Sequence, residues 1–411
     1  MHDALLLEAI ERFGSPLYVY DFDALCSTAR ALLAAFARHD VQVLYAVKAN
    51  SNARVLQALH CEGLAFDACS VGEVQLLLRL GISPSRVHFN ADAVTLDEMR
   101  SLTRTVGGRD VELTVGSLDH LRALVHPDVA WARPIALRLN TGFGAGHSAA
   151  VTTGGELSKF GLSLEDLDEA LAWCLHHQVR CTGFHSHAGS GIGSVRDYLE
   201  NARRLVAVAL ACGLSLDTLN VGGGFPHDYG NGQGLDFDLD SLAAAVESLA
   251  APLRQRSARL RLLVEPGRCL VAGAGVLLCT VASVKRCGDR QYVSVDSGFH
   301  HLARPFLYGA YHGIDNLSAS PDAPQTRVDI VGQLCQSGDV FARDRGLAQP
   351  RVGDRLCIRD AGAYGYAMSS NYNARPRPAE VALMNDQLQL IRRRETLDDL
   401  LRLQTLEKHT C

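Results

Sequence analysis

The stretch "LAFDACSVGEVQLLLRLGISPSRVHFN", residues 64–90, contains two short apolar segments on either side of an amphipathic one. Residues 64–69 and 86–90 have the length and composition of buried strands. Residues 70–81 between them carry apolar side chains at helical spacing. A strand, a helix and a second strand in this order predict a parallel βαβ unit.

The same alternation continues over the first two thirds of the chain. Further strands are predicted at 41–47, 110–115, 134–140, 180–187, 216–222 and 261–266, and further helices include 164–178 and 197–213. Eight strands that alternate with helices predict an α/β fold, a (β/α)₈ TIM-type barrel over residues 23–270. An open doubly wound sheet is the structural alternative, and eight regular units favour closure.

After about residue 270 the pattern changes to short strands, which predicts an all-β second domain over residues 271–411. Its strands are expected at 275–288, 291–298, 326–335, 354–365, 379–386 and 387–394. The N-terminal segment 1–22 contains a short amphipathic helix and a strand at 16–21, and we expect it to join this domain. A Gly/Thr/Ser-rich loop at 141–161 is long enough to suggest a functional role.

Composition excludes several classes of protein. The net charge of −5 and the absence of a basic run argue against nucleic acid or an anionic membrane as partner. No uncharged apolar stretch approaches ~18 residues, and the N-terminus does not resemble a signal peptide. The twelve cysteines form no CxxC pair, so no zinc site is expected, and reduced thiols in a cytoplasmic protein are the predicted state.

Polar residues gather where the predicted barrel strands end, which is where such barrels place their active sites. These residues are Lys48, Asp67, Ser70, Glu73, Arg138, Asn140, His185, His187, Ser190, Gly222, Gly223, Gly224, Glu265 and Arg268. A Gly-rich turn after the seventh strand with an arginine after the eighth is typical of a phosphate site. If the glycines are considered without the arginine, a flexible turn is the alternative interpretation. A GxGxxG motif after the first strand is absent, so a dinucleotide site is not supported.

Lys48 follows an apolar strand and is expected in the barrel mouth, where an unpaired ammonium group is costly to bury. A covalent bond to an aldehyde cofactor removes that cost. A surface lysine at a strand end is the alternative. Together with the phosphate turn, a histidine and a carboxylate, Lys48 suggests pyridoxal 5′-phosphate (PLP) as the cofactor.

Several motifs resemble those of one enzyme family. "YAVKAN", "HAGSG", "GGGFP", "EPGR", "CxSGD" and "GAYGYAMSSNYNARPRP" are similar to the fold-type III PLP-dependent decarboxylases, which have an alanine racemase-like barrel. "GGELSKFG", "RPFLYGAYH" and "IRRRETLDDLL" most resemble the bacterial diaminopimelate decarboxylases. The resemblance covers nearly the whole chain, and the motifs occur in the family's order.

The resemblance implies a role for each matching residue. Lys48 would carry PLP, His187 would stack on its ring and Glu265 would pair with the pyridine nitrogen. The phosphate would be held by Ser190, Gly223, Gly224, Gly267, Arg268 and Tyr364. Asp67, Glu73 and Arg138 would support the lysine and the ring. Cys335 and its neighbour would reach the partner subunit's site, which implies a head-to-tail homodimer.

The chemistry of these residue types agrees with a decarboxylase. A carboxylate keeps the pyridine nitrogen protonated, so the ring withdraws electrons strongly, as CO₂ loss requires. A racemase of this barrel type benefits from weaker withdrawal and typically has arginine there, so Glu265 favours decarboxylation. A cysteine thiol can then return a proton to Cα near neutral pH, which gives Cys335 a catalytic role.

Substrate recognition follows from the same resemblance. Arg304 and Tyr308 of the RPxxY motif would bind a distal carboxylate, with Arg268 and Tyr364 assisting, whereas a surface ion pair is the alternative for Arg304. The expected reaction is decarboxylation of meso-diaminopimelate to L-lysine and CO₂.

Gln336 departs from the family motif, which reads Cys-Glu-Ser and uses its glutamate to bind the substrate's distal ammonium group. Loss of that charge lowers affinity by ~1–2 kcal/mol. Either the chain is a diaminopimelate decarboxylase that tolerates glutamine, or it is a paralogue in a secondary-metabolite or siderophore pathway whose related amino-acid substrate has a neutral distal nitrogen. A catalytically silent, partner-binding homologue is a third alternative, which the presence of Lys48, Glu265 and Cys335 disfavours.

Overall fold

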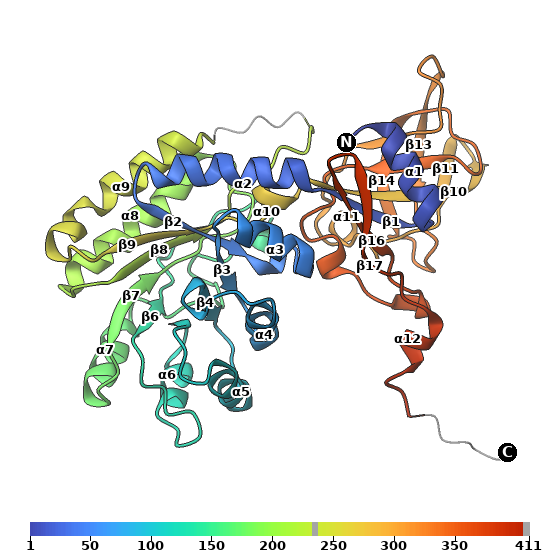
Figure 1. The fold of residues 1–411 in the computed structure, drawn as a ribbon. Helices are drawn as coiled ribbons and strands as arrows, with labels where there is room; N and C mark the ends of the chain where they lie inside the picture. Colours follow the sequence, from blue (N-terminus) through green and yellow to red (C-terminus); the bar gives the residue numbers. More distant parts are fainter. Residues whose placement is uncertain (232–236, 406–411) are drawn as a thin grey trace. The chain divides into compact units, whose positions relative to one another are not determined.

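The computed structural model describes residues 1–231 and 237–405 (Figure 1). The described chain forms two compact units. The first unit comprises residues 26–227 and 237–270, and the second comprises residues 1–25, 228–231 and 271–405. Each unit has its own sheet and is described separately below.

The sheet of the first unit is a closed parallel barrel, as predicted from the alternating pattern. The strands pair in chain order, and β9 closes on β2 with Val41 opposite Leu262. The barrel strands are β2 (Val41–Ala46), β3 (Ala65–Ala68), β4 (Val87–Ala91), β5 (Glu112–Val115), β6 (Ile135–Arg138), β7 (Cys181–His185), β8 (Thr218–Gly223) and β9 (Arg261–Glu265).

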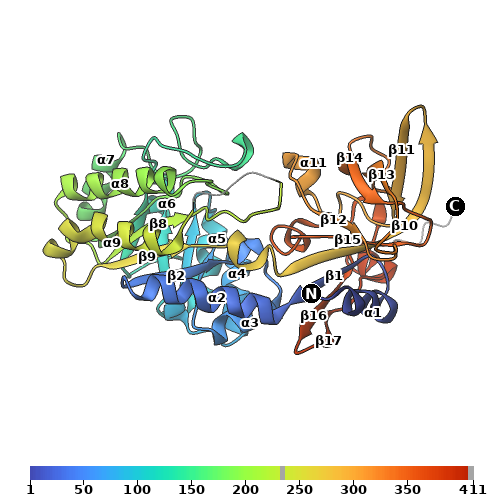
Figure 2. The same cartoon turned by 90° about the horizontal axis from the view of Figure 1, so that it is seen from above.

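Helices cover the outside of these strands (Figure 2). They are α2 (Phe22–Ala37), α3 (Ala53–Cys61), α4 (Val71–Arg79), α5 (Leu96–Val106), α6 (Leu118–Leu124), α7 (Leu167–His176), α8 (Val195–Cys212), α9 (Leu239–Arg256) and the short α10 (Arg268–Val271), with 3₁₀ turns at Val47–Ala49, Pro84–Arg86 and Ala149–Val151. Side-chain caps fix several helix starts: Ser70, Ser117 and Ser194 each accept a backbone N–H three residues on.

The interior of the barrel is unusually polar. Barrel interiors of this kind are normally filled by branched apolar side chains, and here Leu44, Ala65 and Leu263 form a small apolar cluster. Much of the remaining buried interior is polar, including Asp67, Asn90, Thr114, His185, Asn220 and Glu265. Buried polar groups need partners, so this composition already marks the barrel as the place to look for a site.

The second unit is built on a sheet in the order β14-β13-β11-β10-β1-β16-β17, with β15 paired to β10 and β12 paired to β15. Its strands are β1 (Leu17–Asp21), β10 (Gly275–Cys287), β11 (Arg290–Val295), β12 (Ile314–Asn316), β13 (Gln325–Val331), β14 (Val340–Ala348), β15 (Arg355–Ile358), β16 (Ala379–Met384) and β17 (Gln387–Arg392). Its helices are α1 (Asp3–Phe13), α11 (Arg304–Tyr308) and α12 (Leu397–Leu401), with 3₁₀ turns at Tyr366–Met368 and Tyr372–Ala374.

The N-terminal strand joins this second sheet, as expected from the sequence. β1 lies between β10, to which it is antiparallel, and β16, to which it is parallel. Alternate residues of β1 enter two different apolar clusters, Tyr18 on one face and Val19 on the other, where α1 packs. The strand is therefore central, although it is separated in sequence from its neighbours by more than 250 residues.

Three details of the second sheet differ from the expectation, and one of them is the strand expected at 354–365, which ends at Ile358. The strand expected at 326–335 ends at Val331, because Gly332 begins a tight loop around Asp339. Strands β12 and β14 were not predicted, because β12 is three residues long and β14 carries charged residues along an exposed face.

No helix in the described part of the chain is long and apolar enough to span a membrane. Within the same residues, no cluster of three or more His, Cys, Asp or Glu side chains could hold a metal ion. Every cysteine there is a free thiol.

Candidate active site

Lys48 lies in the 3₁₀ turn that directly follows β2, at the C-terminal end of the barrel. Its Nζ is 3.2 Å from Oδ2 of Asp67 and 3.4 Å from Sγ of Cys69. The lysine side chain is 38% exposed, whereas the Asp67 side chain is completely buried. The ammonium group is therefore accessible to a ligand and anchored from below by a buried carboxylate.

Asp67 and Glu265 are two buried carboxylates whose pKa values are shifted in opposite directions by their surroundings. Burial raises the pKa of Asp67, and Glu265 raises it further, against the lowering effect of Lys48. Burial would also raise the pKa of Glu265, but the charge and hydrogen bond of His185, followed by Lys48, lower it below its ordinary value. Glu265 is thus the carboxylate that the surroundings hold in its ionised form.

His187 follows β7 and is held by the Gly-rich turn after β8. The backbone N–H of Gly223 donates to Nδ1 of His187 at 3.0 Å. Burial, together with Lys48 and Arg138, lowers the pKa of His187 well below its ordinary value. The ring is therefore neutral, accepts at Nδ1 and carries its proton on Nε2.

Two of the predicted phosphate residues are in contact. Nη2 of Arg268, at the start of α10, donates to Oγ of Ser190 at 2.9 Å, and Arg268 is 5% exposed. Gly267 precedes Arg268, and a Cβ atom on Gly267 would lie 3.1 Å from Cβ of Ala46. An arginine and a hydroxyl held together in this way suit recognition of a phosphate.

The glycines at the end of β8 are needed for close backbone packing. A side chain on Gly223 would overlap the carbonyl oxygen of Glu265, and one on Gly224 would come within 2.5 Å of the carbonyl oxygen of Gly189. Gly224 also has a φ of 102°, which favours glycine. The N–H of Gly223 is already used by His187, so the phosphate role expected for this glycine stays a prediction.

The long loop at 141–161 wraps the segment that carries His187 and Ser190. Its Thr153 donates from N to the carbonyl of Ala188 and from Oγ1 to the carbonyl of His187, both at 3.0 Å. Ser190 in turn donates from N to the carbonyl of Val151 at 3.0 Å. The loop therefore fixes the backbone on which the predicted ring and phosphate contacts depend.

Arg138, at the end of β6, is paired with a residue that the sequence did not single out. Its Nη1 binds Oδ2 of Asp92, and its guanidinium lies 5.0 Å from the ring centre of Phe160 in the long loop. Oδ1 of Asp92 accepts from the N–H of Gly161 at 2.8 Å. Asp92 thus connects the end of β4, Arg138 and the end of the loop.

The structure adds further residues to the barrel site. Cys69 contacts Lys48, and burial raises its pKa to about 12, so it is a neutral thiol. Its backbone N–H donates to Oε2 of Glu73 at 2.7 Å.

Asn220 donates from Nδ2 to Oε1 of Glu265 at 2.7 Å. The alternation of side chains along β8 could have predicted that Asn220 points into the barrel. For Cys69, the only sequence feature that indicated a place in the site was its position directly after β3.

In the second unit, Arg304 and Tyr308 are four residues apart on α11 and share one face of that helix. Arg304 is 2% exposed, so it is not the surface residue of the alternative interpretation. Its Nη1 lies 2.8 Å from Nε2 of His312, and its guanidinium lies 4.4 Å from the ring centre of Tyr229.

The loop that carries Cys335 and Gln336 is folded around Asp339, whose two carboxylate oxygens accept the N–H groups of Phe299 and Leu334 at 2.7 and 2.8 Å. Cys335 is exposed, with Sγ 3.5 Å from Oδ1 of Asn373. Gln336 is also exposed, and its Nε2 donates to Oη of Tyr372 at 2.9 Å. The thiol is therefore presented on the surface of the second unit.

Tyr364, also in the second unit, has a φ of 55°. A left-handed backbone is uncommon for tyrosine and often marks a functional position. Of the residues that were predicted to have a role, eleven belong to the barrel unit and five to the sheet unit.

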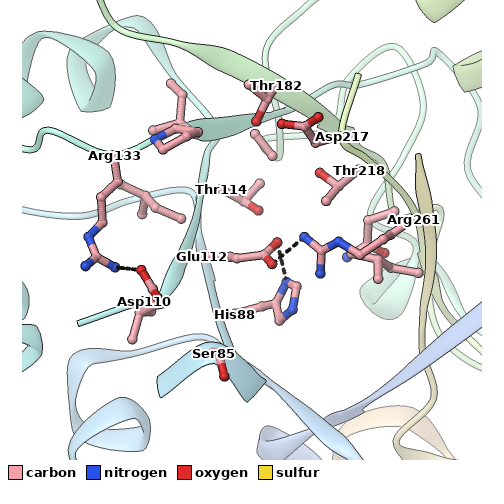
Figure 3. A pocket seen from close by; sticks show the side chains of 17 residues that line it. Ser85, His88, Asp110, Glu112, Thr114, Arg133, Thr182, Asp217, Thr218 and Arg261 are labelled. Carbon is pink, nitrogen blue, oxygen red and sulfur yellow. Dashed lines mark hydrogen bonds and ion pairs between the residues drawn. The ribbon is translucent and has the colours of Figure 1, made fainter. Parts of the chain in front are cut away.

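A hollow of about 250 Å³ lies at the opposite, N-terminal end of the barrel strands. Figure 3 shows Glu112 between His88 and Arg261, with the Arg133–Asp110 pair nearby. Nη2 of Arg261 is 2.6 Å from Glu112, and Nδ1 of His88 is 3.4 Å from it. Because this end of such barrels normally contributes to stability, these ion pairs are best explained as structural.

The residues at the C-terminal end fit PLP by their chemistry. An accessible lysine can bind an aldehyde, Arg268 and Ser190 can bind a phosphate, and ionised Glu265 can pair with a protonated ring nitrogen. A closed parallel barrel with these groups at one mouth defines a PLP-dependent barrel enzyme.

Comparison with known proteins agrees with this class. The family described as the pyridoxal-binding domain of the pyridoxal-dependent decarboxylases matches residues 23–272. The diaminopimelate decarboxylase of Escherichia coli K12 is 37% identical over 98% of this chain and 96% of its own length. That of Methanothermobacter thermautotrophicus is 35% identical over 96% and 93%. The chain therefore belongs to the pyridoxal-dependent decarboxylases, and within them to the diaminopimelate decarboxylase family.

Solved structures show the same relationship. Diaminopimelate decarboxylase of Helicobacter pylori, complexed with L-lysine, superposes with a TM-score of 0.88 and 30% identity over 97% of this chain and 98% of that one. The enzyme of M. jannaschii, in a co-complex with L-lysine, gives a TM-score of 0.89 and 30% identity over 99% and 95%.

Proposed function

We propose that the chain decarboxylates meso-diaminopimelate to L-lysine and CO₂ with PLP as cofactor. The observation that carries this proposal is the placement of Lys48, Asp67, His187 and Glu265 at one end of a closed barrel, with Arg268 and Ser190 in contact. Two similar structures are described as complexes with L-lysine, the product of this reaction.

Bound PLP supplies an electron-withdrawing ring for the loss of the carboxylate. Lys48 binds the aldehyde group, and Asp67 keeps the lysine in place before the cofactor arrives. His187, held by the N–H of Gly223, covers a ring face, and Glu265 holds a proton on the ring nitrogen. Arg268, Ser190 and Tyr364 bind the phosphate.

Arg304 and Tyr308 bind the distal carboxylate of the substrate in this proposal. The position of Arg304 is supported by His312, whose Nδ1 lies 2.8 Å from the carbonyl oxygen of Arg359. Since a carbonyl only accepts, Nδ1 carries the proton and Nε2 accepts from Arg304. A neutral histidine therefore fixes the arginine without neutralising its charge.

Cys335 is the proposed proton donor to Cα, and the proposed assembly is a head-to-tail homodimer in which Cys335 and Gln336 serve the partner subunit's site. Two exposed aromatic side chains near the thiol support an interface: Phe306 is 42% exposed and Tyr372 38%, and both stack on Phe299. Exposed apolar side chains that gather in this way often mark a protein–protein contact.

A cytoplasmic setting is part of the same proposal. All cysteines in residues 1–231 and 237–405 are free thiols, and free thiols in this number are typical of a reducing compartment.

A second candidate function is decarboxylation of a related amino acid whose distal nitrogen carries no charge. Gln336 favours it, because its Nε2 is used by Tyr372 and its side chain presents a neutral oxygen where the family has a carboxylate. Such an acceptor suits an acylated or otherwise neutral nitrogen.

CO₂ release from a substrate panel tests the proposed function. The panel contains meso-diaminopimelate, its acylated and hydroxylated relatives, lysine and ornithine. We expect turnover of meso-diaminopimelate with L-lysine as product, and no turnover by Lys48→Ala. Preference for an acylated relative would favour the second candidate, and inactivity on the whole panel with PLP bound would refute both.

A further inference from the structure

His185, the last residue of β7, lies against the carboxylate of Glu265 inside the barrel. Its side chain is completely buried, and its Nε2 is 3.3 Å from Oε2 of Glu265, whose side chain is 3% exposed. The other oxygen of Glu265 accepts from Nδ2 of Asn220 at 2.7 Å. The two donors lie on strands β7 and β8, and each contacts a different oxygen of the carboxylate.

The contacts of the ring decide which nitrogen carries the proton. Among the residues that the structure describes, Nδ1 of His185 has no hydrogen-bond partner. Nε2 faces a carboxylate, which only accepts, so Nε2 carries a proton and donates it to Glu265, whether or not Nδ1 is also protonated. Nδ2 of Asn90 is placed 3.3 Å from the same nitrogen, so donation from Nε2 to Glu265 requires the Asn90 amide to be turned with its oxygen toward the ring.

Other titratable groups also act on Glu265, and they differ in direction. Those facing it from the surrounding elements are Lys48, Asp67, Cys69, His88, His187 and Tyr198. Burial and Asp67 favour the neutral acid, whereas Lys48 favours the carboxylate. His185, in contrast, both contacts the carboxylate and donates to it.

We propose that His185 is a positioning residue that keeps Glu265 ionised and fixed, and thereby sets how strongly the bound cofactor withdraws electrons. This inference rests on the proposed function, in which Glu265 pairs with the pyridine nitrogen. His185 touches neither substrate nor cofactor in this account and acts through Glu265 alone.

The consequence for pH follows from the direction of the effect. His185 lowers the pKa of Glu265, so its removal leaves burial and Asp67 to raise that pKa. The carboxylate then takes up a proton at a higher pH, and the pairing with the ring nitrogen is lost there. Activity and the visible absorption of the bound cofactor should both change at a higher pH than in the wild type.

The experiment compares holoenzymes carrying His185→Leu, His185→Gln and His88→Gln with the wild type. His185→Leu removes the donor, and His185→Gln keeps an N–H near the position of Nε2. His88→Gln is the matched control, because His88 is a buried barrel histidine that contacts Glu112 and not Glu265, and burial lowers its pKa, so its removal takes no charge away from Glu265. The readouts are the pH profile of kcat, the pH titration of the cofactor absorption, and the melting temperature.

For His185→Leu we expect the acidic limb of kcat and the absorption titration to move together to higher pH. His185→Gln should restore most of the wild-type pH profile. His88→Gln should keep the wild-type pH profile even if its melting temperature is lower. Profiles of His185→Leu that match the wild type would overturn the inference. If His185→Leu does not fold, a shifted profile for the polar but shorter His185→Asn supports the inference, and an unshifted one overturns it.

Different results would refute the proposed function and the role of His185. A wild-type holoenzyme that is inactive on meso-diaminopimelate would refute the proposed function, whatever the variants show. An active wild type with an unshifted His185→Leu profile would refute only the role of His185.

Discussion

Cys335 and Gln336 are neighbours in sequence and have different surroundings. The thiol is exposed and lies 3.5 Å from Asn373, whereas the Gln336 amide is bonded to Tyr372. Tyr372 belongs to a short turn in which Asn373 and Ala374 have positive φ values. Both side chains therefore depend on a strained turn about 40 residues away in the chain.

Replacing Cys335 with alanine tests its role as proton donor. The variant should still bind PLP, because the barrel residues are unchanged, and kcat should fall about 100-fold, as expected for loss of a general acid. Steady-state kinetics with meso-diaminopimelate, together with the solvent-deuterium content of the product, measures this effect. A variant with wild-type kcat and product would remove Cys335 from the mechanism.

Replacing Gln336 with glutamate tests the one departure from the family motif. A carboxylate would form a charge-assisted bond with the distal ammonium group, which stabilises the complex by ~1–2 kcal/mol and raises kcat/KM for meso-diaminopimelate about 5-fold to 30-fold. If kcat/KM does not rise, glutamine is a neutral replacement at this position. Gln336→Ala serves as the control for loss of the bond to Tyr372.

At the scale of elements, the barrel was predictable because each strand is a short apolar run next to a helix with a clear apolar face. The site residues at strand ends followed from the barrel's own geometry. Asp92 and His185 were not assigned roles, because their partners Arg138 and Glu265 lie 46 and 80 residues away in sequence. Such contacts depend on strand order and side-chain direction, which periodicity alone does not specify.

The long loop depends on Asp92, and Asp92→Asn tests that dependence. Asparagine keeps an acceptor for Gly161 but leaves the Arg138 guanidinium, whose side chain is 9% exposed, without its counter-charge. Loss of one partner of a largely buried pair should lower the free energy of unfolding by about 3 kcal/mol and weaken PLP binding.

Chemical denaturation and PLP titration measure these two effects. Asp97→Asn is the control, because the Asp97 side chain is 88% exposed and its pair with Arg100 should contribute less than ~1 kcal/mol. Equal stability and cofactor affinity for Asp92→Asn and the wild type would show that the loop is held by its backbone hydrogen bonds alone.

At the scale of the whole molecule, the predicted site residues fall into two groups on two units of one chain. Lys48 belongs to the barrel unit and Cys335 to the sheet unit. In the proposed head-to-tail homodimer, one complete site contains Lys48 of one subunit and Cys335 of the other.

Mixing Lys48→Ala and Cys335→Ala proteins tests this sharing. A mixed dimer has one site with both native residues, so free subunit exchange should restore about a quarter of wild-type activity from two nearly inactive proteins. Native mass spectrometry confirms that exchange has occurred. Exchange without recovered activity would place both residues of a site on the same subunit.

The central claim is that Lys48 carries the cofactor of a decarboxylase, and the composition of the chain makes this simple to test. The chain has four lysines, at positions 48, 159, 285 and 408. Borohydride reduction of the PLP-loaded protein, followed by peptide mass spectrometry, identifies which of them is bonded to the cofactor. We expect the label on Lys48 alone, with none in Lys48→Ala. A label on another lysine, or no label in a protein that binds PLP, would contradict the account.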